Sequence, residues 1–278
     1  MGTQTAPDRR PTLELDGVSF GYQNTAVLAE VTLQVREGEF ICLLGPSGSG
    51  KSTMLRLLAG LESPQKGSIR LGGAQVVGPG LDRGVVFQDY SLFPWMSLTE
   101  NVVLAIGKAH PGLLREQRHE LAEEYLELVG LAEARAKYPG ELSGGMCQRG
   151  AIARVLAMGA PVLLMDEPFG ALDPVNRTRL QDLLLEIWNA SKPARTIVFV
   201  THDVDEALLL ADRVVVLGAC PGRIIADMEV PIPRPRPRRQ TYARPEFHTL
   251  RKTVNEHLQG DMLRRLSDAE TVEEAAGI

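Results

Sequence analysis

The sequence lacks long apolar runs and has few cysteines. Nowhere does it approach the ~18 consecutive apolar residues that a membrane-spanning helix requires. Cysteine occurs only at positions 42, 147 and 220, which is too few for a disulfide framework, and a reducing compartment is therefore expected. The polar N-terminus also lacks the apolar segment of a secretory signal, and residues 1–11 are expected to form a disordered leader.

An excess of basic residues is missing as well. Lys and Arg together number 30 against 35 Asp and Glu, which gives a formal net charge of -5. A dedicated nucleic-acid-binding protein usually shows the opposite balance, so no nucleic-acid partner is expected. The chain of 278 residues, 44% hydrophobic and 23% charged, is otherwise typical of a globular protein with a sizeable core.

The most informative segment is a glycine-rich loop between two apolar stretches. It follows the pattern G-x-x-x-x-G-K-[ST] of a phosphate-binding P-loop and consists of Gly45, Pro46, Ser47, Gly48, Ser49, Gly50, Lys51, Ser52 and Thr53. Glycine allows the backbone to fold around a phosphate with several N–H groups pointing inward. Lys51 is expected to reach the β and γ phosphates of a nucleotide, and the Ser52 hydroxyl to bind Mg²⁺. A plain glycine turn between a strand and a helix is the alternative.

Apolar periodicity predicts alternating strands and helices. Strands are expected at 13–20, 27–35, 68–77 (a short hairpin), 85–87, 161–165, 196–200, 214–217 and 223–229. Helices are expected at 54–61, 101–106 with Thr99 as the cap, 116–129, 151–158, 175–188, 204–211 and 247–266. Strands separated by helices, with polar residues at the strand ends, indicate an α/β protein with a mostly parallel sheet.

Polar side chains follow three of these strands, and another glycine-containing loop precedes a helix. Asp166 and Glu167 end one apolar run, at the edge where α/β sheets place ligands. Gln88 and His202 end two others. The segment Leu142 to Arg149 has a serine and two glycines ahead of a helix, and it forms a second candidate anion site. Two such helix N-termini in one chain cannot easily face the same phosphate, but a dimer can bring them to opposite sides of it.

Three features have more than one interpretation. Tyr22, at an expected turn, either stacks on an adenine or is an exposed turn residue. The cluster Leu92-Phe93-Pro94-Trp95 is either a plug in the core or a docking surface. The proline- and arginine-rich segment 231–239 is read as an extended, semi-rigid linker, with contact to anionic lipid or a partner protein as the alternative.

Taken together, these motifs resemble the ATP-binding subunit of an ABC transporter over about Leu13 to Glu229. The resemblance is carried by the P-loop, Gln88, the signature Leu142 to Arg149, the strand end at Asp166 and Glu167, residues 171–173 (Ala-Leu-Asp), and His202. It implies a nucleotide-binding domain at 12–230 with a P-loop NTPase core, an N-terminal antiparallel β-subdomain and an inserted helical subdomain at about 90–160. Residues 231–278 would form the Pro/Arg linker, a C-terminal helix and an acidic tail.

The resemblance also implies a mechanism. Two subunits, identical or closely paralogous, pair head to tail, and each ATP lies between the P-loop of one and the loop Ser143, Gly144, Gly145 of the other. Asp166, Ser52 and Gln88 hold Mg²⁺. Glu167 is the general base that activates water, His202 contacts the γ-phosphate, and Lys51 stabilises the transferred phosphoryl group.

Within this family the chain is most similar to the ATPases of nitrate, sulfonate, taurine and bicarbonate importers. The similarity includes Leu92 to Met96, Met146, residues 168–173, the run Pro221 to Ile224 and the Pro/Arg tail followed by a helix. Expected partners are permease subunits and, indirectly, a solute-binding protein, with the chain peripheral to the cytoplasmic face of the membrane.

The alternatives are an exporter or lipoprotein-release ATPase, and a non-transport ABC ATPase. Residues 221–224 and the tail disfavour the first. Chromosome-maintenance ATPases insert coiled-coil arms between P-loop and signature, and no sustained heptads occur here. Translation-associated ATPases carry two motif sets in one chain. The signature also departs from its family: Cys147 stands where a basic residue is usual, and Gly150 replaces a bulkier residue. An exposed thiol at Cys147 would be open to oxidation or alkylation.

Overall fold

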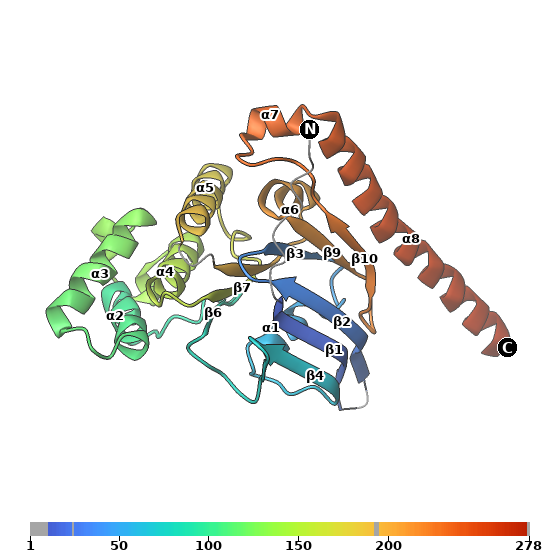
Figure 1. Ribbon diagram of the computed structural model, residues 1–278, viewed down its shortest axis with the longest axis horizontal. Helices are drawn as coiled ribbons and strands as arrows, with labels where there is room; N and C mark the ends of the chain where they lie inside the picture. The colour runs from blue at the N-terminus through green and yellow to red at the C-terminus, as the bar shows by residue number, and fades with distance from the viewer. Residues whose placement is uncertain (1–10, 24, 192–194, 277–278) are drawn as a thin grey trace. The chain divides into compact units, whose positions relative to one another are not determined.

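The computed structural model describes residues 11–23, 25–191 and 195–276, and for residue 11 and residues 264–276 the backbone alone. The expected leader lies outside the described residues except for its last position, which begins a strand. The chain divides into two compact units, the first formed from residues within 1–58, 62–76 and 200–278, the second from 59–61 and 77–199. Figure 1 traces their helices and strands in the colour order of the sequence. None of the helices in the described ranges combines the length and apolar composition that crossing a membrane requires.

The first unit contains an antiparallel sheet with the strand order β2-β1-β4-β5. Its strands are β1 (Pro11–Tyr22), β2 (Thr25–Arg36), β4 (Lys66–Leu71) and β5 (Ala74–Gln75). Along β2 buried and more exposed residues alternate, which buries Leu33 and Val35 on one face. This is the N-terminal β-subdomain that the sequence predicts. Strand β1 is longer than expected and takes in Tyr22, because Gly21 and Tyr22 pair with the start of β2.

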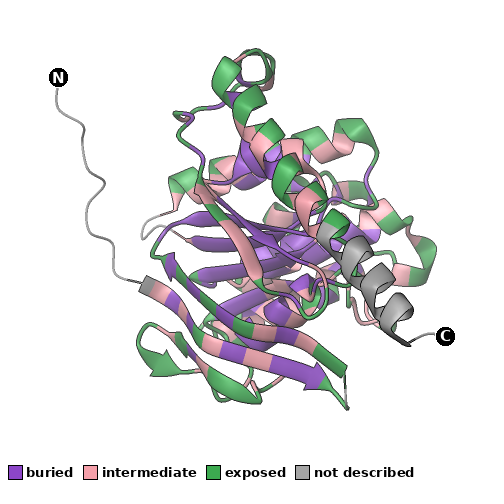
Figure 2. Cartoon of the chain, turned by 90° about the vertical axis from the view of Figure 1, so that its right-hand side faces the viewer, coloured by how far each residue is buried: buried purple, intermediate pink, exposed green. Residues whose placement is uncertain are grey.

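A second group of strands in the first unit leads to the glycine-rich loop. Strand β3 (Phe40–Leu44) pairs in parallel with β9 (Arg213–Leu217), and β9 pairs antiparallel with β10 (Ile224–Glu229). All residues of β3 are buried, and buried residues dominate the central strands in Figure 2. The helices of this unit are α1 (Lys51–Leu58), α6 (Val204–Leu210), α7 (Arg238–Tyr242) and α8 (Pro245–Ala276), and α6 packs on β3 and on α8.

The second unit combines parallel strands with a helical part. Strands β6 (Arg83–Val86) and β7 (Val162–Asp166) are parallel, and β8 (Thr196–Val200) neighbours β7. Helices α2 (Leu98–Ala109), α3 (Arg115–Leu128) and α4 (Gly144–Ala157) pack on one another within the range expected for the helical subdomain. Two 3₁₀ turns (Ala132–Ala134 and Pro139–Glu141) connect α3 to α4, and α5 (Pro174–Ala190) follows β7.

Two helix starts differ from the sequence expectation. Ser97, not Thr99, caps α2, because Ser97 and Glu100 form a reciprocal capping box with bonds of 3.3 and 2.7 Å. The Thr99 hydroxyl donates to the Arg135 carbonyl oxygen at 3.0 Å instead. Helix α4 begins at Gly144 rather than near residue 151, since Ser143 caps it. The glycines that suggested a loop are therefore its first turn.

The C-terminal region differs more. Helix α8 runs from Pro245 to Ala276, through the residues expected to form an acidic tail. The expected linker is not a solvated spacer, because Ile232 and Arg236 are buried within it. A guanidinium can be buried when carbonyl oxygens surround it, and the sequence pattern of prolines and arginines did not reveal these acceptors.

Candidate functional site

The glycine-rich loop of the first unit connects β3 to α1. Gly48 and Gly50 have φ angles of +80° and +86°, which L side chains rarely adopt. A Cβ atom on Gly45 would lie 2.5 Å from the Leu217 carbonyl oxygen of β9. Glycine is thus required at these positions by the backbone itself. The outer side of the loop, residues 46–48, is exposed and open to a ligand.

Lys51 is the first residue of α1, and its side chain folds back over the loop. Its Nζ donates to the Gly45 and Pro46 carbonyl oxygens, both at 2.9 Å. The residue is only 8% exposed, and a buried ammonium needs such acceptors. A phosphate is a stronger acceptor for the same donors. Ser52, the next residue, is exposed in the first turn of the helix, where N–H groups have no partner within the helix.

His202 lies at the end of the first unit where β3 leads into the glycine-rich loop. Thr201 donates its N–H to the Leu43 carbonyl oxygen of β3 at 3.3 Å. Asp203 caps α6 by accepting from the first N–H groups of that helix at 2.9 and 3.1 Å. His202 itself is exposed between these two anchors. The structure therefore brings His202 and the glycine-rich loop to the same end of β3.

Gln88, Asp166 and Glu167 lie at one edge of the second unit. Strands β6 and β7 run in parallel with Val86 opposite Met165, so the residues that follow both strands emerge at the same edge. Asp166 is only 7% exposed, whereas Glu167 is partly exposed and Gln88 is exposed. This edge presents one buried carboxylate, one accessible carboxylate and one accessible amide.

The backbone of Glu167 adopts an unusual conformation. Its φ angle is +46°, in the left-handed region that non-glycine residues seldom occupy. Such a conformation costs about 1–3 kcal/mol and persists where the surrounding structure enforces it. The Glu167 carbonyl oxygen accepts from the Gly170 N–H at 3.1 Å, which closes a tight turn. Strain of this kind is frequent at functional sites. It marks the Glu167 side chain as a candidate functional group.

The second glycine-containing loop begins α4 in the second unit. Ser143 is the N-cap, and its Oγ accepts from the Met146 N–H at 3.3 Å. Gly144 and Gly145 have no positive φ, and α4 counts them in its first turn. A Cβ atom on Gly144 would lie 3.1 Å from the Tyr90 hydroxyl. Ser143 and Gly144 are exposed, so this helix N-terminus is accessible from outside.

Both departures from the usual signature have a packing explanation. Cys147 is 8% exposed, and its Sγ lies 3.6 Å from the Pro139 carbonyl oxygen. Burial raises the pKa of this thiol, so the exposed reactive thiol considered from the sequence is not present. A Cβ atom on Gly150 would lie 2.6 Å from Leu98 Cδ2, which leaves no space for the bulkier residue that is usual there.

The loop after Gln88 is held by Arg154 of α4, a residue that the sequence analysis did not single out. Its guanidinium donates to the Ser91 carbonyl oxygen at 2.6 Å and to that of Tyr90 at 3.4 Å. Tyr90 and Ser91 have φ angles of +66° and +47°, a conformation that needs such support. An arginine inside an apolar helix pattern was the only sequence signal.

Asn101 of α2 holds the next part of this loop. Its side chain is fully buried, accepts from the Phe93 N–H at 2.8 Å and donates to the Phe93 and Met96 carbonyl oxygens at 3.2 and 3.1 Å. A polar residue on the inward face of an apolar helix could have indicated this role. Because the loop backbone is fixed, Trp95 is 68% exposed and its ring lies 5.5 Å from that of Phe93. The cluster is an accessible apolar surface and not a core plug.

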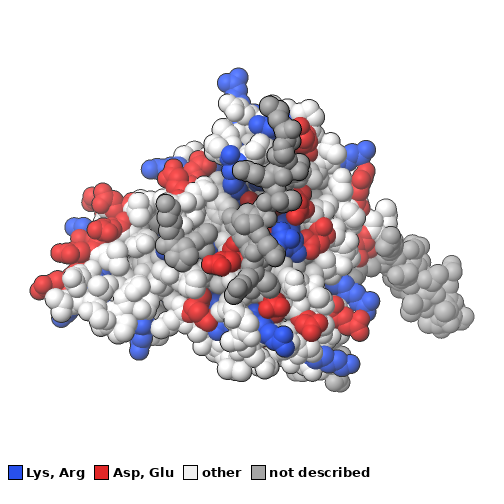
Figure 3. Space-filling view, in the orientation of Figure 1, with Lys and Arg blue, Asp and Glu red and all other residues white. Residues whose placement is uncertain are grey.

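Helix α3 of the same unit presents a charged surface, unlike this apolar cluster. The outer face of α3 carries exposed glutamates and is visibly acidic in Figure 3, with Glu116, Glu120, Glu123, Glu124 and Glu127. Such a face is solvated and gains nothing from an apolar or anionic surface. The Phe93–Trp95 cluster, in contrast, presents an accessible apolar surface.

Tyr22 stands at the end of β1 in the first unit. Its ring packs edge-on against Phe20 with centroids 4.9 Å apart, and its hydroxyl lies 3.5 Å from Glu62 Oε1. The residue is 45% exposed. Adenine stacking on Tyr22 stays a prediction, and the observed contacts leave part of its ring accessible for it.

A comparison with known families decides how these features are to be read. The ABC transporter family model matches residues 28–170. This chain belongs to the ABC transporter family. The matched range contains the glycine-rich loop, the acidic strand end and the second glycine-containing loop, and the chain is an ATPase. The family predicted from the motifs is confirmed.

Curated relatives and solved structures agree with this assignment. The bicarbonate transport ATP-binding protein CmpD of Synechococcus elongatus is 45% identical over 252 residues, which cover 89% of this chain and 90% of that protein. The nitrate import ATP-binding protein NrtD of the same organism is 47% identical over 81% of each chain.

Among solved structures, the ATP-binding cassette MJ0796, determined as a dimer in a post-hydrolysis state with ADP and Pi, superposes with a TM-score of 0.71. It is 32% identical in sequence, and the match covers 78% of this chain and 98% of that one. The predicted fold class, an α/β P-loop core with an antiparallel sheet, is confirmed.

Proposed function

We propose that this ABC ATPase energises the import of nitrate, bicarbonate or a similar small anion through membrane permease subunits, acting at the cytoplasmic face of the membrane. The observation that carries the proposal is similarity along almost the whole chain to ATPases named for bicarbonate transport and nitrate import. A permease and a solute-binding protein select the anion, because the functional residues described in this chain act on ATP.

Two copies are proposed to pair head to tail around two ATP molecules. The P-loop of one copy holds the phosphates, and Ser143, Gly144 and Gly145 of the other copy approach the γ-phosphate. Support comes from the exposed N-terminus of α4, whose glycines are not required by backbone angles. The similar cassette MJ0796 was itself solved as a dimer.

The residues at the strand ends fit the metal-nucleotide complex. No group of three or more His, Cys, Asp or Glu side chains within the described ranges is arranged to hold a metal by itself. Mg²⁺ in nucleotide sites takes one or two carboxylates together with substrate phosphates and water, so the Ser52 hydroxyl, Gln88 amide and Asp166 carboxylate are a suitable donor set. When bound, the ion neutralises phosphate charge and orients the γ-phosphate.

This chain's own groups then supply the rest of the chemistry. Glu167 accepts a proton from the attacking water, a role that suits its accessible carboxylate and its fixed backbone. Lys51 moves from the loop carbonyls to the phosphates and stabilises charge on the transferred group. His202 donates to the γ-phosphate, and Gln88 positions water.

Reconstitution tests the direction of transport. The full-length chain, combined in liposomes with the permease subunits that co-purify with it, should hydrolyse ATP faster when a solute-binding protein loaded with nitrate or bicarbonate is supplied on the side opposite ATP. Substituting Phe93 and Trp95 with polar residues should abolish co-purification with the permease and leave basal turnover intact. A rate of ATP hydrolysis that does not depend on the binding protein, and that rises when solute is added on the ATP side, would instead indicate an exporter.

A further inference from the structure

The ATPase reaction does not explain residues 231–237, the part of the proline- and arginine-rich segment that precedes α7. Its prolines are exposed, whereas Ile232 and Arg236 are buried and Arg234 is partly buried. Proline has no N–H group to satisfy and tolerates the outward positions of an extended segment. The alternation directs the arginines of this segment into the first unit, away from any lipid or partner surface.

Arg236 binds the C-terminal end of α6. Its Nη1 donates to the carbonyl oxygens of Leu208 and Leu209 in the last turn, at 3.0 and 3.3 Å, and to that of the C-cap residue Ala211 at 2.6 Å. Its other nitrogens donate to the Ile232 carbonyl oxygen at 2.9 Å and to that of Val230, just before the segment, at 3.1 Å. Burial lowers the pKa of Arg236 to about 10, so the side chain stays a cation at neutral pH. A cation here satisfies carbonyls that a helix end leaves without partners.

Arg234 connects the same segment to the P-loop strand. Its Nε donates to Asp212 Oδ1 at 2.9 Å, and its guanidinium also donates to the Leu210 carbonyl oxygen. Asp212 in turn accepts from the Phe40 N–H at 3.1 Å and donates its own N–H to the Phe40 carbonyl oxygen at 2.7 Å. Phe40 is the first residue of β3, the strand that leads into the glycine-rich loop.

Helix α8 adds an apolar contact with α6. Phe247 and Val254 are fully buried at positions seven residues apart, on one face of α8, which packs on α6. Arg251 lies between them, and its Nε forms an ion pair with Asp205 Oδ1 at 3.1 Å without hydrogen-bond alignment. Both partners are half exposed, so this pair adds little, and apolar burial carries the contact.

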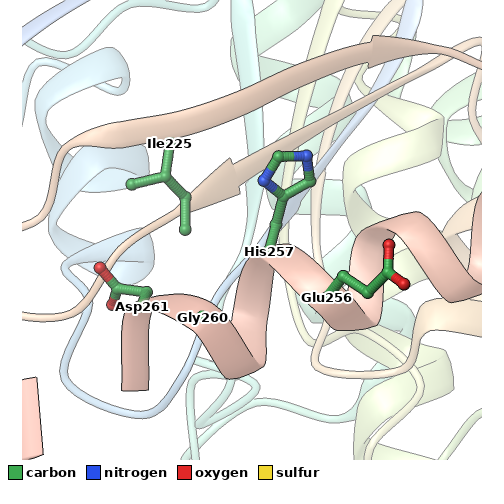
Figure 4. Close-up of a pocket in the computed structure, with 5 residues that line it drawn as sticks. All are labelled: Ile225, Glu256, His257, Gly260 and Asp261. Carbon is green, nitrogen blue, oxygen red and sulfur yellow. The ribbon is translucent and has the colours of Figure 1, made fainter. Parts of the chain in front are cut away.

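Further along, α8 meets the β9–β10 connection. Asp261 Oδ2 accepts from the Ala219 N–H at 2.9 Å. Figure 4 shows Glu256, His257 and Asp261 along α8, with a pocket between them and Ile225 of β10. This contact is polar and open, so the firm attachment of α8 is the one to α6.

We propose that residues 231–254, here called the C-terminal brace, set the rate of ATP hydrolysis by fixing α6 and thereby His202, with Arg236 as the positioning residue. Helix α6 has seven residues and is about 10 Å long, and His202 directly precedes its N-cap. A displacement at the end held by Arg236 is carried to His202 because so short a helix moves as one piece. The inference rests on the proposed contact between His202 and the γ-phosphate.

A double-mutant cycle on the full-length chain tests the brace. We expect Arg236→Gln to lower kcat about tenfold through misplacement of His202, with the KM for ATP little changed. In a His202→Ala background the same substitution should lower kcat no further, because its target is gone. Arg239→Ala, an exposed arginine on α7, is the matched control and should leave kcat unchanged.

The outcomes separate the brace from a merely structural role. Equal fold losses in both backgrounds, or a normal kcat in Arg236→Gln accompanied only by a lower Tm, would overturn the inference. If Arg236→Gln does not fold, Arg236→Lys replaces it, since lysine keeps the charge but not the fork of donors. Arg236→Lys is then expected to lower kcat by a smaller factor, and only in the chain that retains His202. Full turnover in His202→Ala would refute the His202 role itself, whereas a slow His202→Ala with a normal Arg236→Gln refutes the brace alone.

Discussion

The two glycine-containing loops of this chain precede α1 and α4, and they use glycine for different reasons. Before α1, Gly48 and Gly50 have positive φ angles, and a Cβ atom on Gly45 would collide with the neighbouring strand β9. At the start of α4, Gly144 has ordinary helical angles and Ser143 provides a regular cap. The conformation of the first loop is imposed by its own backbone and the neighbouring strand. The second is an accessible helix N-terminus, for which we propose a function only when a second copy brings ATP to it.

The two loops should differ most in their effect on ATP binding by the chain without its permease. Lys51→Ala removes the buried ammonium of the P-loop, and we expect the affinity for Mg-ATP to fall by about 100-fold or more, as for loss of a charge-assisted contact. Ser143→Ala should leave that affinity within about twofold while turnover falls, because Ser143 is proposed to act on the other copy's ATP. Equilibrium binding of a fluorescent ATP analogue measures both. A comparable loss of affinity in the two variants would remove the distinction between the loops.

Stability should distinguish the loops next. Gly50→Ala forces an L side chain into φ +86° with its Cβ 2.7 Å from Leu28 Cδ2, and a cost of about 1–3 kcal/mol is expected. Gly144→Ala has no such strain and needs only a small shift of the Tyr90 hydroxyl, so its free energy of unfolding should change by less than about 0.5 kcal/mol. Denaturant unfolding of both variants gives the comparison. Equal destabilisation would show that the α4 glycine is also a backbone requirement.

A smaller effect concerns the thiol in the second loop. Burial raises the pKa of Cys147, so little thiolate forms at neutral pH. Burial in β3 raises the pKa of Cys42 further. Cys220 is exposed and should react with a thiol reagent first. Labelling of the native protein followed by peptide mapping should find Cys220 modified well before the other two. Rapid modification of Cys147 would mean that the start of α4 opens in solution.

The sequence was sufficient to predict the family, the α/β core and the residues at strand ends, because each of these features depends on residues that are close together in the chain. Glycine spacing, the apolar runs before Asp166 and His202, and the alternation along β2 each report on their own segment. The sequence was insufficient where a side chain's partner is distant in the chain. Arg236 finds carbonyl oxygens at the end of α6, and Arg154 holds Ser91. Neither partner can be read from the residues around the arginine.

Local signals also misplaced some boundaries. Glycines in the signature suggested a loop, but Ser143 satisfies a first-turn N–H and the helix begins there. Prolines at 231–237 suggested a spacer, because proline patterns report backbone stiffness and not what the intervening side chains contact.

The most direct test of the account is the assembly state of Glu167→Gln. This variant keeps both loops but removes the proposed general base, which should lower kcat by about 10²- to 10⁴-fold and preserve bound ATP. Analytical ultracentrifugation should find a monomer without nucleotide and a dimer with Mg-ATP, and a further Gly144→Ala substitution should abolish the dimer without abolishing ATP binding. A Glu167→Gln chain that binds Mg-ATP and stays monomeric would contradict the claim that the loop at α4 completes the ATP site of a second copy.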